Sequence, residues 1–266
     1  MRESRPGWQP KTLLDVGSGP GTAAWAAIEI WPALDRITLL DRDDRMISLG
    51  KRLARHAPAS ALQSATWLRT DVSRQWEAGP HELVIAAYLL GEAPASRRSD
   101  LVERLWSVAA DSLVIVEPGT PLGFGLVRQA RDRLRESGAH TLAPCPHNDA
   151  CPMGADDWCH FAQRITRTPL HRKVKAGTLP FEDEKFSYAA MSRHEGVPIG
   201  GRVLRHPQIR RGHIQLEVCT PEGLERRVVT RRDPGAFRRA RKTRWGSTPG
   251  PTHLNRAMAR EVTMGC

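Results

Sequence analysis

The sequence predicts an α/β protein whose main domain is a doubly wound, mostly parallel sheet. Three observations support this fold class. Short apolar runs alternate with helix-forming segments between residues 12 and 137. A glycine-rich turn follows the first run, and an acidic residue follows or ends each of the next two. This alternation is typical of parallel strands joined by crossover helices.

Composition and the distribution of charge limit the possible functions. The chain has 266 residues, 40% of them hydrophobic, which is enough for a large domain with an appendage. No apolar run reaches the roughly 20 residues of a membrane-spanning helix. Residues 1–11 lack the apolar core of a signal peptide. We therefore expect a cytoplasmic protein that does not contact a membrane.

The positive charge is concentrated at one end of the chain. The net charge of the whole chain is +11, and residues 196–266 hold 15 basic and five acidic residues, a net of +10. A basic block of this kind favours a nucleic-acid partner.

The first predicted strand leads directly into the glycine turn. Thr12–Val16 is apolar, Gly17-Ser-Gly-Pro-Gly21 follows it, and residues 22–31 are rich in helix formers. Glycine lets the backbone turn tightly and approach a ligand without a Cβ clash. The helix start then offers free N–H groups and a partial positive charge. Strand, glycine turn and helix in this order predict a nucleotide-binding site.

The rest of the sheet domain repeats the strand and helix pattern. Further strands are expected at 37–41, 66–70, 82–90 and 112–117, and further helices at about 43–56, 98–110 and 123–137. Asp41 ends the second strand twenty residues after Gly21, the spacing at which a carboxylate accepts from ribose hydroxyls. Asp71 follows the third strand. In the alternative interpretation the glycines form only a tight turn and the two acids only cap helices.

The glycine turn also resembles a known cofactor motif. It reads Asp-x-Gly-x-Gly-x-Gly, and it is similar to motif I of class I S-adenosylmethionine-dependent methyltransferases. The resemblance implies a class I methyltransferase (Rossmann-like) fold. It also implies which residues contact each part of the cofactor. The methionine part would contact Asp15, Gly17, Gly19 and Gly21, the ribose would contact Asp41, and the adenine would contact Asp71. NAD is the alternative cofactor, although the G-x-G-x-x-G of a pyrophosphate site is absent.

The sequence offers no recognisable catalytic motif. The 82–90 run is followed by Gly91-Glu92, without the Asn/Asp-Pro-Pro-aromatic of amino methyltransferases or the Pro-Cys pair of RNA cytosine-C5 enzymes. Glu92 or Glu117 could act as a base, or each could be a solvated or capping carboxylate. Whether the protein is an enzyme is left open.

Four of the five cysteines are candidate metal ligands. Cys145, Cys151 and Cys159 lie within fifteen residues, and Cys219 ends a predicted strand. In a reducing compartment clustered thiols are more often ligands than disulfides. We expect the four thiolates to converge on one inorganic centre that fastens the sheet domain to the basic region. Cys266, the last residue, is expected to take no part.

The type of centre stays open at this point. The loose C-x5-C-x7-C spacing, with proline after the first two cysteines, favours an iron–sulfur cluster. His147 and His160 keep zinc as the alternative. The remaining alternative is a group of buried free thiols.

The last quarter of the chain is predicted to form a small basic β region. A strand at 185–193 is expected to join the main sheet, and short strands follow at about 202–206, 213–219 and 226–231. Guanidinium groups suit phosphate contacts because they are planar and always charged. The predicted nucleic-acid-binding residues are Arg210, Arg211, Arg231, Arg232, Arg238, Arg239, Arg241, Lys242 and Arg244. Trp245 could stack on a base, but a place in the core is favoured.

Several segments together resemble the ribosomal small-subunit methyltransferase-like family, and the chain has the features of a bacterial member. The segments are Cys145–Phe161, Arg172–Leu179, Phe181–Tyr188 and Ala240–Gly246. The resemblance covers about 10–246. It implies binding to small-subunit rRNA and a [4Fe–4S] cluster on Cys145, Cys151, Cys159 and Cys219. Mitochondrial members of that family assist assembly of the small ribosomal subunit, and methyl transfer by them is uncertain.

These observations predict three parts: an S-adenosylmethionine-binding domain at 1–144, a cysteine-cluster insertion with a returning strand at 145–195, and a basic β-rich region with a flexible tail at 196–266. We expect a monomeric, rRNA-binding assembly factor of the small ribosomal subunit that carries S-adenosylmethionine and the cluster. The alternatives are an active S-adenosylmethionine-dependent RNA methyltransferase and a zinc-containing nucleic-acid-binding protein.

Overall fold

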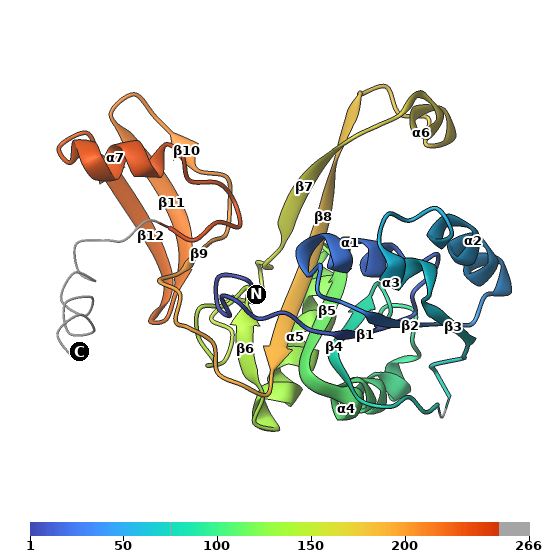
Figure 1. Ribbon diagram of the computed structural model, residues 1–266. Coiled ribbons are helices and arrows are strands. Elements are labelled where there is room, and N and C mark those ends of the chain that lie inside the picture. Colours follow the sequence, from blue (N-terminus) through green and yellow to red (C-terminus); the bar gives the residue numbers. More distant parts are fainter. Residues whose placement is uncertain (75, 250–266) are drawn as a thin grey trace. The chain divides into compact units, whose positions relative to one another are not determined.

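The computed structural model describes residues 1–74 and 76–249 and divides the chain into two compact units (Figure 1). The first unit holds Met1–Ala143 and Lys185–Val197. The second holds Pro144–Glu184 and the described residues from Pro198 on. The tail predicted for the C-terminus, with Cys266, lies outside the described residues.

A mostly parallel sheet organises the first unit. Its strands are β1 (Thr12–Val16), β2 (Arg36–Asp41), β3 (Thr66–Arg69), β4 (His81–Ala87), β5 (Ala109–Pro118), β6 (His140–Ala143) and β8 (Phe181–Ser192). They lie in the order β3-β2-β1-β4-β5-β8-β6. Strands β1 to β5 pair in parallel, and β8 is antiparallel to both of its neighbours. The predicted returning strand is confirmed: β8 begins in the second unit, enters the first at Lys185 and pairs with β5.

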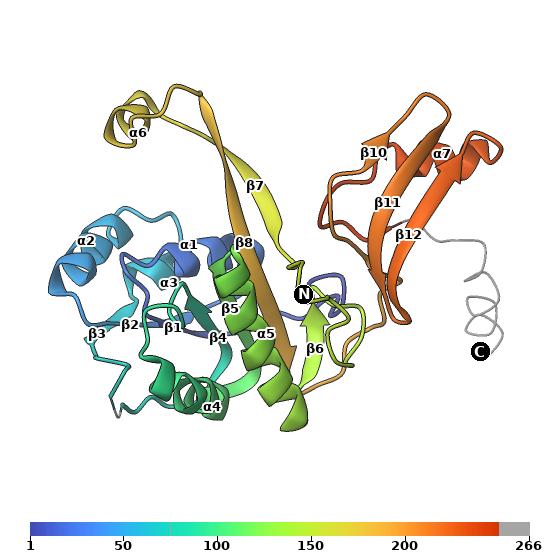
Figure 2. The same cartoon turned by 180° about the vertical axis from the view of Figure 1, so that it is seen from behind.

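Helices cover both faces of this sheet. They are α1 (Thr22–Ile30), α2 (Asp44–Ala54), α3 (Ser60–Gln63), the 3₁₀ turn η1 (Ala95–Arg97), α4 (Arg98–Val108) and α5 (Pro121–Glu136). One core packs α4 and α5 against the sheet (Figure 2), and a second packs α1 and α3 against its other face. The class I methyltransferase (Rossmann-like) doubly wound fold is therefore confirmed.

The apolar strands explain why two cores form. Neighbouring side chains of a strand point to opposite faces, so Leu13 of β1 enters one core and Leu14 the other, and both are fully buried. Each such burial contributes about 1.5–3 kcal/mol. The sheet is thereby held between two layers of helices, with the carboxyl ends of β1, β2 and β4 along one edge.

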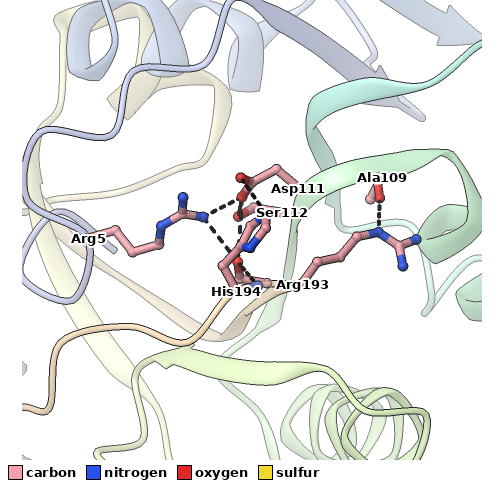
Figure 3. Close-up of polar contacts among 7 residues, drawn as sticks. Arg5, Ala109, Asp111, Ser112, Arg193 and His194 are labelled. Carbon is pink, nitrogen blue, oxygen red and sulfur yellow. Dashed lines mark hydrogen bonds and ion pairs between the residues drawn. The ribbon is translucent and has the colours of Figure 1, made fainter.

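A polar cluster ties the N-terminal segment to the opposite edge of the sheet (Figure 3). The Arg5 guanidinium lies 2.5 Å from Oδ1 of Asp111 at the start of β5, and it donates to Ser192 Oγ at the end of β8 at 3.1 Å. His194 Nε2 lies 3.7 Å from Oδ2 of the same carboxylate, and Ser112 Oγ donates to its Oδ1 at 2.7 Å. One carboxylate thus joins the segment before β1 to strands β5 and β8.

The second unit contains a small antiparallel sheet, and also a strand followed by a short helix that precedes β8. Its elements are β7 (Phe161–Thr166), α6 (Pro169–Val174), β9 (Arg202–Val203), β10 (Gln208–Ile209), β11 (His213–Thr220), β12 (Gly223–Thr230) and α7 (Pro234–Ala240). The sheet order is β10-β11-β12, with β9 also on β11. Helix α7 covers one face of it (Figure 1). The three strands predicted in this region correspond to β9, β11 and β12.

Candidate functional site

The glycine turn lies between β1 and α1 and has the predicted backbone. Gly17, Gly19 and Gly21 all have positive φ, at 70°, 55° and 87°, which glycine adopts without strain. A Cβ on Gly17 would lie 2.8 Å from Leu89 Cδ1, and one on Gly21 would lie 2.9 Å from the Trp67 ring. The turn therefore requires glycine for close packing as well as for its backbone shape.

The two acids at the strand ends stand beside this turn. Asp41 Oδ2 accepts the Gly19 N–H at 2.7 Å, and Oδ1 accepts the Asp43 N–H at 2.8 Å. Helix α2 is capped by Asp43 instead, so Asp41 is not a helix cap. Asp71 Oδ1 accepts from the Ser73 hydroxyl at 2.6 Å and from its N–H at 3.1 Å. These two hydrogen bonds lower the pKa of Asp71, and the bond from the Ser73 hydroxyl has the larger effect. The carboxylate therefore stays an anionic acceptor.

Asp15 has a different position from the other predicted cofactor residues. It is 1% exposed, and its Oδ2 accepts the Ala24 N–H in the first turn of α1 at 3.2 Å. Burial raises the pKa of Asp15 to about 7 against the effect of that bond, and the charge of Asp41 adds to the rise. Asp15 thus lies behind the turn and binds the start of α1.

A cavity of about 350 Å³ opens at this edge of the sheet. Its lining includes four of the six predicted cofactor residues, namely Gly17, Gly19, Asp41 and Asp71. Asp15 and Gly21 are not in the lining. The remaining wall is Arg42, Asp43, Met46, Thr70, Val72, Ser73, Ala87, Tyr88, Leu89, Glu92, Ala93 and Leu101. A lining that combines carboxylates and glycines with apolar side chains suits a nucleoside.

The two candidate bases have different surroundings. Glu117 is 1% exposed, and its Oε1 accepts the Leu90 N–H at 2.7 Å. Burial raises the pKa of Glu117 despite hydrogen bonds from the loop after β4. Glu92 lines the cavity and pairs with Arg42 at 3.9 Å. Glu117 thus holds the loop after β4. The contacts described for Glu117 and Glu92 do not identify either of them as a catalytic base.

The four candidate cysteines all belong to the second unit. Cys145, Cys151 and Cys159 are partly buried and Cys219, on β11, is buried. Burial, followed by the charges of the other three thiols, raises the pKa of Cys159. Cys219 Sγ lies 3.5 Å from His147 Nε2. Residues far apart in the sequence are thus brought near one another.

The arrangement differs from the sequence-based expectation in two ways. Among the described residues, no group of three or more His, Cys, Asp or Glu side chains is positioned to hold a metal ion. A centre on these thiols would also lie within the second unit. It would fasten the 145–159 loop to β11, so the prediction that it joins the sheet domain to the basic region is wrong.

Arginine and aromatic side chains surround the cysteine loop. Arg202 Nε donates to Pro144 O at 3.2 Å, and Arg205 donates to Trp158 O at 3.2 Å while pairing with Asp157. His160 stacks on Trp158 with 5.2 Å between ring centroids.

Trp245 completes this aromatic group. Its ring centroid lies 5.0 Å from that of His160 and 4.9 Å from that of His206. Trp245 is half-buried, so it packs in the second unit, as favoured from the sequence.

The predicted basic surface is exposed, and part of it gathers at one end of the small sheet. All nine predicted nucleic-acid-binding residues are exposed. The Arg231 N–H donates to Gly212 O at 3.4 Å, which places the end of β12 beside the β10–β11 turn. Arg210, Arg211, Arg231 and Arg232 therefore all lie at this end of the small sheet. Within residues 198–249, the ion pairs found engage other arginines, Arg205 and Arg227.

The remaining five predicted contacts follow from α7 onward. Arg238 and Arg239 lie in the last turn of α7, and Arg241, Lys242 and Arg244 come after it. The Arg231 guanidinium lies 5.7 Å from the centre of the ring of Phe237, which belongs to α7.

Among the described residues, none of the helices combines the length and the apolar character that a membrane span requires.

Comparisons with known proteins give a family and several relatives. Residues 1–248 match the family described as mitochondrial small ribosomal subunit Rsm22. The chain is 30% identical over 270 residues to the human ribosome assembly protein METTL17, mitochondrial, covering 92% of this chain and 57% of that protein. It is 23% identical over 283 residues to the Rsm22-cox11 tandem protein 2, mitochondrial, of Schizosaccharomyces pombe, covering 88% and 38%. The chain therefore spans little more than half of one relative and less of the other.

Two methyltransferases are among the solved structures similar to this chain. The N-methyltransferase NodS from Bradyrhizobium japonicum is 15% identical with a TM-score of 0.46, covering 73% of this chain and 92% of that one. The magnesium protoporphyrin IX methyltransferase from Synechocystis, with bound SAM, is 14% identical with a TM-score of 0.45, covering 70% and 71%.

Proposed function

The chain belongs to the mitochondrial small ribosomal subunit Rsm22 family, and from this premise we propose that it is an assembly factor that binds small-subunit rRNA. The observation that carries the proposal is the exposed basic surface of the second unit. Two chain segments place Arg210, Arg211, Arg231 and Arg232 at one end of the small sheet, and the ion pairs found among the described residues 198–249 engage Arg205 and Arg227 instead. Exposed, uncompensated guanidinium groups attract phosphate and release its counterions.

The relatives support this choice of partner. The human relative is named a ribosome assembly protein and matches 92% of this chain. The basic surface lies within the family match, which ends at residue 248.

The binding test uses purified protein and small-subunit rRNA. Replacing Arg210, Arg211, Arg231 and Arg232 together by Ala should weaken retention of the rRNA more than tenfold, because four phosphate-binding groups are lost. A matched control replaces four exposed cations on and beside α2 by Ala: Arg45, Lys51, Arg52 and Arg55. Equal losses in both variants would show that only net charge matters and would contradict the assigned surface.

We propose that the cavity of the first unit binds S-adenosylmethionine. Gly17 and Gly19, predicted to contact the methionine part, Asp41, predicted to contact the ribose, and Asp71, predicted to contact the adenine, all line it. Asp41→Ala should weaken binding of S-adenosylhomocysteine more than tenfold in calorimetry, because the ribose acceptor is removed. Asp35→Ala, an exposed acid just before β2, is the matched control. Unchanged affinity in the Asp41 variant would contradict the site.

We further propose a [4Fe–4S] cluster on Cys145, Cys151, Cys159 and Cys219. The chemistry of the donors supports this, since the second unit holds four cysteines and thiolate sulfur is the donor that such a cluster takes. Thiolates are the usual ligands of such a cluster, which would supply a cross-link between the loop and β11. The 3.5 Å approach of His147 to Cys219 keeps zinc as the alternative metal.

Metal analysis of anaerobically purified protein decides between these centres. We expect iron and sulfide in equal amounts, lost in Cys219→Ser and kept in Cys266→Ser. Zinc without iron or sulfide would support the zinc-containing alternative. Protein that contains neither iron, sulfide nor zinc would support the remaining alternative, a group of buried free thiols.

An active RNA methyltransferase is the second candidate function, because the cofactor cavity is open beside the loop after β4. The assembly role without catalysis is favoured because Glu117 holds that loop and no base is assigned. Transfer of tritiated methyl groups to small-subunit precursors, abolished in Asp41→Ala, would favour the enzyme.

A further inference from the structure

Tyr88 follows β4 at the wall of the cofactor cavity and has an unusual backbone. Its φ is 57°, in the left-handed region that a bulky side chain rarely adopts. Glycine would be free of this strain. A strained aromatic residue that lines a cavity is more often functional than accidental.

Buried neighbours hold the strained turn from the adjacent strand. The Tyr88 N–H donates to Val116 O at 2.7 Å, and the Leu90 N–H donates to Glu117 Oε1 at 2.7 Å. Arg98 Nε adds hydrogen bonds to Leu90 O at 3.0 Å and Ala93 O at 3.1 Å. The turn is thus fixed on both sides of Tyr88.

The next residue locks the same turn against the glycine motif. Leu89 is 8% exposed, and its Cδ1 occupies the space beside Gly17 that a Cβ would need. Leu89 is therefore the packed residue of the turn. Tyr88, in contrast, is 49% exposed, so its ring is presented to solvent at the cavity by a rigid support.

We propose that Tyr88 is a stacking platform for a nucleobase of the bound RNA at the mouth of the cofactor cavity, and that Glu117 is the positioning residue that holds the platform there. This inference rests on the proposed rRNA binding and on the proposed cofactor site. It concerns binding only and involves no covalent step.

A nucleobase fits this position better than other groups. An exposed aromatic ring offers a flat face, and RNA-binding proteins use such rings to hold unstacked bases. Arg42 and Glu92 line the same cavity with polar groups, which can meet the edge of a base.

Photocrosslinking tests the proposal directly. Small-subunit rRNA substituted with 5-bromouridine is bound to the S-adenosylhomocysteine-loaded protein and irradiated, and crosslinked peptides are identified by mass spectrometry. We expect a crosslink at Tyr88, retained in Tyr88→Phe and lost in Tyr88→Ala, because the aromatic face is the only part needed. Glu117→Gln should reduce the crosslink several-fold while Tyr88 is still present.

Two further readouts separate the possible failures. Retained rRNA with crosslinks elsewhere but none at residue 88 overturns the platform and leaves the proposed function standing. No retained rRNA in the unmodified protein overturns the proposed function, and the platform with it. A crosslink at Tyr88 together with weaker S-adenosylhomocysteine binding in Tyr88→Phe would assign the hydroxyl to the cofactor and overturn the role as a base platform.

The backbone strain gives an RNA-independent check. Tyr88→Gly should raise the melting temperature relative to Tyr88→Ala, because only glycine relieves the positive φ. Equal melting temperatures would show that the turn is unstrained. They would overturn the argument that the protein tolerates backbone strain in order to hold the Tyr88 ring at the cavity.

Discussion

At the scale of single residues, the glycine motif divides into two roles. Gly17, Gly19 and Asp41 face the cavity, whereas Asp15 is buried behind the turn and binds the Ala24 N–H. The sequence motif alone cannot separate these roles, because Asp15 and Asp41 both follow apolar runs. The difference comes from the first turn of α1, which covers Asp15 and removes it from water.

The pKa of Asp15 makes one contribution to stability depend on pH. The unfolded carboxyl ionises near 3.8 and the folded one near 7, so the contribution is complete below about pH 4 and is lost as the pH rises toward 7. Asp15→Asn should abolish this dependence and gain up to about 4 kcal/mol relative to wild type at neutral pH. Urea unfolding at several pH values measures the difference, and a constant difference would contradict the assignment.

The Arg5–Asp111 pair is a second residue-scale test. Both side chains are mostly buried, at 17% and 15% exposure, so Arg5→Ala leaves a carboxylate without its strongest donor. We expect a loss of about 1–3 kcal/mol in the free energy of unfolding and faster proteolysis before β1. Arg2→Ala, at an exposed position, is the control. Equal effects of the two changes would mean that the pair shown in Figure 3 contributes little.

At the scale of elements, most strands and helices between residues 12 and 137 could be predicted, whereas some short elements later in the chain could not. The runs at 12–16 and 37–41 correspond to β1 and β2 within one residue, because long apolar runs and helix formers are local signals. The two-residue strand β10 was missed, since it exists only by pairing with β11. The shape of the turn at Tyr88 was missed for the same reason, because Val116 and Glu117 of β5 impose it.

Helix α5 offers an element-scale test with an internal control. A Cβ on Gly123 would lie 2.0 Å from Pro118 O, whereas one on Gly125 would meet nothing within 4 Å. Gly123→Ala should therefore push α5 away from β5 and lower the melting temperature. Gly125→Ala should stabilise the protein by about 0.5–1 kcal/mol, the usual gain in a helix interior. Thermal unfolding decides, and a stabilised Gly123 variant would show that α5 can move freely.

At the scale of the whole molecule, the distribution of charge and the family membership both support the proposed partner, small-subunit rRNA. The sequence predicted the site of positive charge well, because exposure of arginine needs no special packing. It predicted the grouping of cysteines but not their confinement to the second unit, since only the folded chain shows which strand Cys219 joins.

Salt dependence is the prediction that belongs to this scale. The affinity for small-subunit rRNA should fall linearly with salt on a log–log plot, with a slope of about −0.7 to −0.9 for each phosphate neutralised. Removing Arg210, Arg211, Arg231 and Arg232 should make the slope less negative by about 3. A shallow slope for the unmodified protein would indicate a partner recognised by apolar contacts instead.

The position of β8 has a consequence for how the protein is made. It fills the gap between β5 and β6, yet the 37 residues 144–180 separate it from the end of β6. During translation β6 emerges long before the strand that connects it to β5, and the nascent sheet has an open slot until residue 192 leaves the exit tunnel. A slowly translated stretch after β6 would therefore prolong the time for which the edge of β5 stays unpaired.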